Sequence, residues 1–149
     1  MKDIILGTVS YATLRNEDLI PSFLEELIRI DSDNNTARDI EARIEEESYY
    51  NSEDSVYDLE ALFDELNNLC ADIPYVYFGA TEGNSSDFGY WVAWDDLIDD
   101  IQDGNLSAYQ DFKDNQGEHT FVVMEDPEYP GRYQHYVSLY QGMVKQWEV

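Results

Sequence analysis

Carboxylates are the residues of this sequence whose types and spacing could do chemistry. The stretch 49–69, YYNSEDSVYDLEALFDELNNL, contains six Asp and Glu residues and no Lys or Arg. Carboxylates can bind calcium, act as a catalytic acid–base pair, or form charge-assisted hydrogen bonds with the Lys and Arg of a partner. The sequence therefore poses a choice among a metal site, a catalytic site and a protein-binding surface.

Helical periodicity sorts these carboxylates into rows. Apolar residues recur at three- and four-residue steps between Val56 and Leu69, which predicts an amphipathic helix over 53–69 with two acidic rows opposite its apolar side. The same pattern predicts a second acidic helix over 95–103. We expect the acids of both helices to face solvent unpaired and to contact a partner. These candidate partner-binding residues are Glu53, Asp54, Asp58, Glu60, Asp64, Glu65, Asp95, Asp96, Asp99, Asp100 and Asp103.

The charge is extreme and is concentrated in the middle of the chain. The 149 residues include 33 acidic and 8 basic ones, for a formal net charge of −25. Arg43 and Lys113 bracket 69 residues without a single base, and this window holds 18 of the carboxylates. Like charges at i,i+4 destabilise a helix by roughly 0.2–0.5 kcal/mol per pair, so folding alone would favour Glu–Lys pairs.

So acidic a surface excludes several classes of partner. Nucleic acid and anionic lipid are polyanions and would be repelled, so we expect no direct nucleic-acid binding and no membrane binding. Disordered acidic chains are poor in aromatic residues, whereas this one has 12 Tyr, 6 Phe and 3 Trp. We therefore expect a folded protein with a basic partner. A surface that serves only solubility, or adaptation to high salt, are the alternative explanations of the charge.

Metal-binding and catalytic patterns do not match. The stretch DSDNNTARDIEA, which starts at Asp31, has Thr36 where an EF-hand needs Gly and Ala42 where it needs Glu. The two histidines, His119 and His135, lack metalloprotease spacing, and Cys70 follows an apolar seam typical of a buried thiol. We expect no metal, no cofactor and no enzymatic activity.

The element order predicts an α+β fold, with one antiparallel sheet and three to four helices on one side of it. We expect a single domain over residues 1–149. Strands are predicted over 3–9, 73–80, 87–94, 119–125, 133–140 and 143–149, and helices over 16–31, 37–48, 53–69 and 94–103. The runs 73–80 and 87–94 form one predicted hairpin, and the runs 119–125 and 133–140 form a second. The aromatic residues of the first, within 75–94, could be core or interface. The chain starts without a signal peptide or apolar span, which predicts a cytoplasmic protein.

Two segments carry a resemblance. EDSVYDLEALFDELNN and the downstream YVYFGATEGNSSDFGYWVAWDDL resemble a pattern found in small acidic proteins of phages and mobile elements, over about residues 14–98. In charge and size the chain is also similar to phage-encoded DNA mimics, which inhibit restriction enzymes or CRISPR effectors. The net charge of −25 equals that of about 42 Å of duplex DNA.

This resemblance implies an inhibitor of a host defence nucleoprotein that occludes a basic nucleic-acid-binding channel inside a bacterial cell. The alternative is an acidic interaction module that neutralises a basic partner without mimicking DNA. The sequence leaves open which protein is the target, whether it belongs to a CRISPR or a restriction system, and the oligomeric state.

Overall fold

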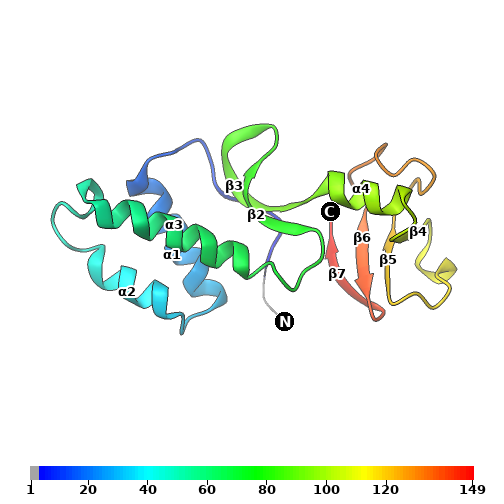
Figure 1. The fold of residues 1–149 in the computed structure, drawn as a ribbon, viewed down its shortest axis with the longest axis horizontal. Helices are drawn as coiled ribbons and strands as arrows, with labels where there is room; N and C mark the ends of the chain where they lie inside the picture. Colours follow the sequence, from blue (N-terminus) through cyan, green and yellow to red (C-terminus); the bar gives the residue numbers. More distant parts are fainter. Residues whose placement is uncertain (1–3) are drawn as a thin grey trace. The chain divides into compact units, whose positions relative to one another are not determined.

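The computed structural model describes residues 4–149 and has an α+β fold, as predicted (Figure 1). Within those residues there are four α-helices and two sheets, of three and four strands. The elements in chain order are β1 (Gly7–Ser10), α1 (Asn16–Ile30), α2 (Asn35–Arg43), η1 (Tyr49–Asn51), α3 (Glu53–Asn68), β2 (Val76–Thr81), β3 (Asn84–Val92), α4 (Trp94–Gln102), β4 (Ser107–Tyr109), η2 (Phe112–Asp114), β5 (Thr120–Val123), β6 (Ser138–Gln141) and β7 (Val144–Glu148), where η marks a 3₁₀ helix.

The chain divides into two compact units, where the sequence led us to expect one domain with one sheet. Unit 1 comprises the chain up to Asp72 together with Val76–Trp91, and unit 2 comprises Ile73–Tyr75 with Val92–Val149. Each unit has its own sheet, and each is described by itself. No helix among residues 4–149 is long and apolar enough to cross a membrane.

The sheet of unit 1 has the strand order β1-β3-β2. Only Glu82 and Gly83 separate β2 from β3, which confirms the predicted hairpin. The first strand, predicted over residues 3–9, is Gly7–Ser10 and pairs antiparallel with β3; residue 3 lies outside the described residues. A Cβ on Gly89 would lie 2.1 Å from the Gly7 carbonyl oxygen, so this strand pair requires a glycine there.

The core of unit 1 forms where α1 packs beside α3 and both meet the hairpin (Figure 1). Leu19, Ile20, Phe23, Leu24 and Leu27 of α1 are buried, as the wide apolar arc of this helix predicts. In the hairpin, the side chains of Phe78 and Tyr90 are 2% and 0% exposed, while Phe88 and Trp91 are half-buried. Phe78 and Tyr90 therefore belong to the core, whereas the other aromatic residues within 75–94 are half-buried.

Helix α2 begins and ends earlier than the predicted span of 37–48. The side chain of Asn34 caps the helix by accepting a hydrogen bond from the Ala37 amide at 3.0 Å. The helix ends at Arg43, and Ser48 has a left-handed φ of 66° before the short helix η1. The three consecutive glutamates at 45–47 lie in the turn between these helices.

Unit 2 contains α4 and the sheet β4-β5-β6-β7. Strands β5, β6 and β7 are antiparallel neighbours, which confirms the pairing of the second hairpin and the last strand, but β6 begins only at Ser138, whereas the strand was predicted from residue 133. Strand β4 was not predicted, and it runs parallel to β5. Its three residues, Ser-Ala-Tyr, are too few to show an alternating pattern. The Trp147 indole donates a hydrogen bond to the Pro74 carbonyl oxygen at 2.9 Å, which ties the segment 73–75 to this sheet.

Candidate functional site

Helix α3 carries four carboxylates that face solvent. Glu53, Asp54, Glu60 and Asp64 are exposed, and none makes a side-chain hydrogen bond or ion pair with any other residue of 4–149. Glu53 and Asp54 lie in the first turn, where negative charge interacts favourably with the helix dipole. Glu60 and Asp64 lie further along, one turn apart, where they repel each other. These four match the predicted unpaired acidic surface, and their contact with a partner stays a prediction.

Asp58 does not belong to that surface. It is 7% exposed, and its two carboxylate oxygens accept hydrogen bonds from the Arg43 guanidinium at 2.7 and 3.1 Å. The Tyr49 hydroxyl donates a third, at 2.7 Å. The prediction that Asp58 faces solvent unpaired is therefore wrong, because the end of α2 and helix η1 both turn back onto this position of α3.

Electrostatics agree with a structural role for this group of three. The hydrogen bond with Asp58 raises the pKa of Arg43, which keeps the guanidinium charged. Burial, and then the hydrogen bond to Asp58, raise the pKa of Tyr49 well above its ordinary value. Arg43 is the last base before the 69-residue acidic window, and its charge is already used within the fold.

Glu65 is also held inside the fold, contrary to the prediction that it is unpaired. It is half-buried, and it accepts hydrogen bonds from the Asn34 amide at 3.3 Å and from the Thr36 hydroxyl at 3.2 Å. Asn34 is the N-cap of α2, so Glu65 fixes the start of α2 against α3. Its carboxylate positions the two helices relative to each other and is not part of an unpaired acidic row on the surface.

The acids of α4 divide in a similar way within unit 2. Asp95, Asp96, Asp99 and Asp103 are exposed without a side-chain partner among residues 4–149. Asp100 is half-buried and accepts a short hydrogen bond from the Tyr75 hydroxyl. Burial, followed by this bond, raises the pKa of Tyr75. The prediction of an unpaired carboxylate is therefore wrong for Asp100 and right for the other four.

The exposed acids that lie beyond the first turn of each helix destabilise it. Neither α3 nor α4 has a basic residue in its last turn, where a positive charge would interact favourably with the helix dipole. Asp103 instead places a negative charge at the C-cap of α4. In α4 the pairs Asp95–Asp99 and Asp99–Asp103 are like charges at i,i+4 spacing. Glu53, Asp54, Asp95 and Asp96 lie in first turns, where the helix dipole favours them, so it is Glu60, Asp64, Asp99 and Asp103 that the stability of the helices does not explain.

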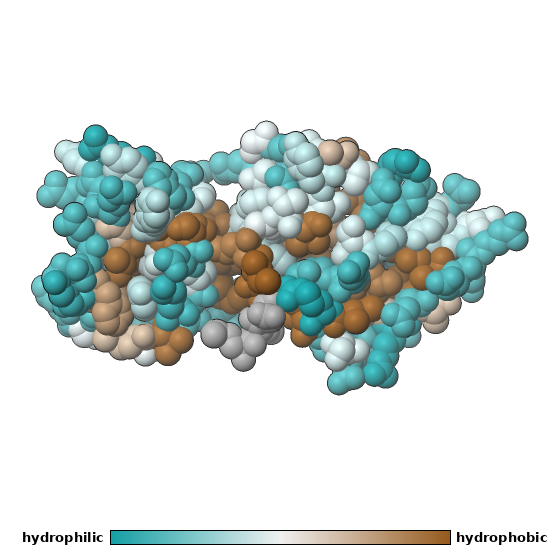
Figure 2. Space-filling model, turned by 180° about the vertical axis from the view of Figure 1, so that it is seen from behind, coloured by the Kyte–Doolittle hydropathy of each residue, from teal (hydrophilic) through white to brown (hydrophobic). Residues whose placement is uncertain are grey.

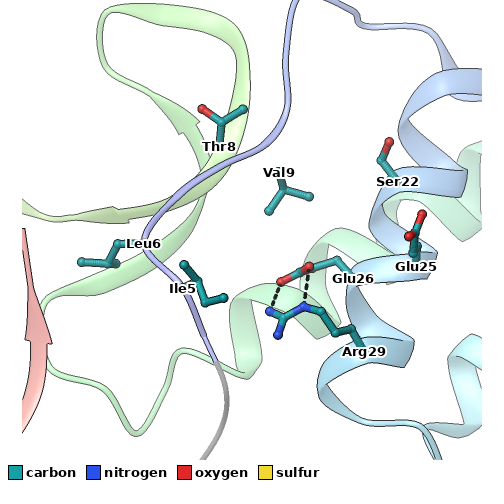
Figure 3. Close-up of a pocket in the computed structure, with 8 residues that line it drawn as sticks. All are labelled: Ile5, Leu6, Thr8, Val9, Ser22, Glu25, Glu26 and Arg29. Atoms are coloured by element: carbon teal, nitrogen blue, oxygen red, sulfur yellow. Dashed lines mark hydrogen bonds and ion pairs between the residues drawn. The ribbon is translucent and has the colours of Figure 1, made fainter.

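One cavity of unit 1, about 430 Å³ in volume, lies between the N-terminal segment and α1 (Figure 3). Ile5, Leu6 and Val9 supply apolar walls, and Glu26 forms a two-point ion pair with Arg29, including a 2.7 Å bond. Because Glu26 neutralises the guanidinium, this cavity is not an anion site. The neighbouring Tyr90 hydroxyl is buried without a hydrogen bond of normal geometry to any residue of 4–149, and its pKa is raised by burial and then by Glu26.

A second hollow of unit 1, about 340 Å³, combines apolar walls with acids and was missed by the sequence analysis. We call it the α1–α3 groove. Its lining residues are Leu19, Phe23, Leu59, Glu60, Phe63, Asp64 and Phe88. The apolar residues of α3 were predicted as core alone. Leu59 and Phe63 are half-buried and Val56 is 49% exposed, so α1 does not cover the whole apolar side of α3. The width of that side, about 140° on a helical wheel, is the signal that the sequence offered.

No group of His, Cys, Asp and Glu side chains within residues 4–149 is arranged to hold a metal ion. On the face drawn in Figure 2, hydrophilic residues alternate with bands of apolar residues that reach the surface. Searches for similar proteins returned no family model, no curated protein and no solved structure that matches this chain.

Proposed function

We propose that this chain is a phage-type inhibitor of a host defence nucleoprotein, either a CRISPR effector or a restriction enzyme. It acts as a DNA mimic that occludes the basic nucleic-acid-binding channel of its target in the cytoplasm of a bacterial cell. The observation that carries this proposal is the set of eight exposed carboxylates on α3 and α4 without partners in the described chain. They lie in a 69-residue window that contains no Lys or Arg.

The mechanism is binding without a chemical step. Lys and Arg that normally hold DNA phosphates form charge-assisted hydrogen bonds with carboxylates of α3 or α4 instead. Acids at i,i+4 on a helix are separated by about 6 Å of axis, and the exposed acids with this spacing are Glu60 and Asp64 on α3 and Asp95, Asp99 and Asp103 on α4. A surface of one sign also steers association with a basic channel and raises the on-rate at low salt. DNA and the inhibitor then compete for the same cations.

A second function is favoured by the α1–α3 groove. Its floor and walls are apolar, with Phe63 and Phe88 half-buried at its surface. A phosphate backbone offers no apolar hollow, so this feature is not required for DNA mimicry. It favours the alternative of an acidic interaction module that neutralises a basic partner outside the DNA channel.

Phage plating on defended bacteria tests the proposal. Expression of the chain should restore plating on a strain that carries the targeted CRISPR or restriction system and should have no effect on a strain without it. The test variant neutralises the exposed acids of α3, and a control variant removes the same charge elsewhere. The test variant is Glu53→Gln, Asp54→Asn, Glu60→Gln and Asp64→Asn, and the control is Glu41→Gln, Glu118→Gln, Glu125→Gln and Glu128→Gln.

The control acids are exposed, so both variants are expected to fold. The proposal predicts that the test variant loses protection while the control keeps most of it. Equal protection by both variants would refute the role of the exposed α3 acids, and no protection by the unmodified chain on any defended strain would refute the anti-defence role.

A further inference from the structure

The α1–α3 groove is formed before any partner binds. Phe23 of α1 lies at its floor with 1% exposure, and its ring packs edge-on against Phe88 at a centroid distance of 5.6 Å. Phe63 packs against the same Phe88 at 6.4 Å and against the buried Phe78 at 5.4 Å. Side chains interlocked in this way do not need to be ordered on binding, which lowers the entropic cost of filling the hollow.

The rim of the groove is negative and uncompensated. Glu60 and Asp64 are exposed lining residues, one helical turn apart, and within residues 4–149 neither has a hydrogen bond or ion pair. No Lys or Arg lines the groove. The buried and half-buried acids of the same helix, Asp58 and Glu65, do have partners. The two acids beside the apolar hollow are therefore left to meet charges from outside, as are Glu53 and Asp54 in the first turn of the helix.

The groove continues as a strip along α3. Val56, at 49% exposure, lies one turn before the lining residues Leu59 and Glu60, and Phe63 and Asp64 lie one turn after them. Residues spaced by three, four and seven positions share one side of a helix. Apolar and acidic side chains therefore run beside each other over about two turns, which matches the length over which a helix in a groove presents its own anchors.

Charge complementarity decides what fits this strip. DNA and a second copy of this chain, with its net charge of −25, would both be repelled by Glu60 and Asp64. A neutral apolar segment would fill the hollow and leave both carboxylates unpaired. An amphipathic helix with an apolar side chain between Lys or Arg residues can fill the hollow with that side chain and pair its positive charges with Glu60 and Asp64.

We propose that the α1–α3 groove binds a basic amphipathic helix of the inhibited protein. One apolar side chain of that helix enters between Phe63 and Phe88, and Lys or Arg one turn away pairs with Glu60 and Asp64. This inference rests on one part of the proposed function, the inhibition of a basic target, and it holds whether the bound helix lies inside the DNA channel or outside it. It adds a salt-resistant anchor to a salt-sensitive charged surface.

A designed peptide is the probe. It is a helix with one central Phe and with Lys four residues before and after it, labelled for fluorescence anisotropy. Companion peptides replace the Phe with Leu, with Met or with Ala, or replace both Lys with Glu. The protein variants form a matched pair on the same helix: Glu60→Gln with Asp64→Asn in the groove, and Glu53→Gln with Asp54→Asn outside it.

The groove variant should weaken binding of the Phe peptide by roughly 3- to 30-fold, from two exposed ion pairs, while the control pair changes it less than about 2-fold. The Ala and Glu peptides should bind more weakly than the Phe peptide. At high salt the loss of affinity caused by replacing Lys with Glu in the peptide should shrink, because exposed charges are screened. The loss of affinity caused by replacing Phe with Ala should persist. In NMR spectra the ring signals of Phe63 and Phe88 should shift on binding.

Equal effects of the two variant pairs, equal binding of the Phe and Ala peptides, unmoved Phe63 and Phe88 signals, or no binding by the Phe, Leu or Met peptide would each overturn the groove assignment. Phage plating is a separate readout. A chain that protects phage but fails these peptide tests overturns the groove assignment alone, and a chain that binds the peptide but protects no phage overturns the proposed function.

Discussion

Replacing Asp58 with Asn tests whether this carboxylate holds the fold or a partner. Asp58 accepts two hydrogen bonds from Arg43 and one from the Tyr49 hydroxyl. Breaking a fully buried ion pair costs about 3–5 kcal/mol. Here the Arg43 side chain is 38% exposed, so water replaces part of what it loses, and Asn still accepts one hydrogen bond. We expect the free energy of opening of α3 to fall by about 2 kcal/mol.

Hydrogen-exchange mass spectrometry of α3 peptides measures this change. A loss of about 2 kcal/mol raises the opening equilibrium by about 30-fold. Exchange at α3 is preferred to a global melting curve, because a chain with two compact units need not unfold in a single step. The matched control is Asp64→Asn on the same helix, which removes an exposed carboxylate and should change the opening free energy by less than about 0.5 kcal/mol. Equal protection in the two variants would refute the structural role of Asp58.

Three further predictions concern stability. Gly89→Ala places a Cβ 2.1 Å from the Gly7 carbonyl oxygen, so β1 must move away. We expect the pairing of β1 with β3 to lose about 3 kcal/mol of stability and the amide hydrogens of Gly7–Ser10 to exchange fast. Slow exchange there would contradict the prediction. Burial and Asp58 raise the pKa of Tyr49 above its ordinary 10.0, so above about pH 10 the unfolded chain loses a proton that the folded chain keeps, and stability falls. Tyr49→Phe should reduce this loss of stability at alkaline pH, as measured by urea unfolding at several pH values. An unchanged dependence of the unfolding free energy on pH would contradict the prediction. Asp99→Asn removes two like-charge i,i+4 pairs from α4, so the free energy of opening of α4 should rise by about 0.4–1 kcal/mol and its hydrogen exchange should slow. Faster exchange would show that the Asp99 carboxylate stabilises α4.

The sequence predicts the helices well, because periodicity records which side of a helix is apolar. It could not separate Asp54 from Asp58, which lie one turn apart in the same predicted row. Asp54 is exposed, while Asp58 meets Arg43 and Tyr49. Those partners come from segments whose return onto α3 no helical pattern encodes. Arg43, the last base before the acidic window, was the only hint of a partner.

The division of the chain was hidden for a similar reason. The segment 73–75 belongs to unit 2 although it lies between two parts of unit 1, and one of its ties is the bond from the Trp147 indole to Pro74, 73 positions away. Contacts over such distances leave no local signal. The α1–α3 groove was missed because periodicity marks Leu59 and Phe63 as apolar but cannot say how much of that face a neighbouring helix covers.

Displacement of DNA from the captured target is the most direct test of the central claim. The chain is used to capture proteins from a lysate of defended bacteria, and the purified target is then bound to labelled duplex DNA and titrated with the unmodified chain or with the four-residue α3 variant. DNA mimicry predicts mutually exclusive binding, displacement that weakens as salt rises, and loss of displacement in the variant. A ternary complex of target, DNA and chain would contradict it and would favour an acidic module bound elsewhere on the target.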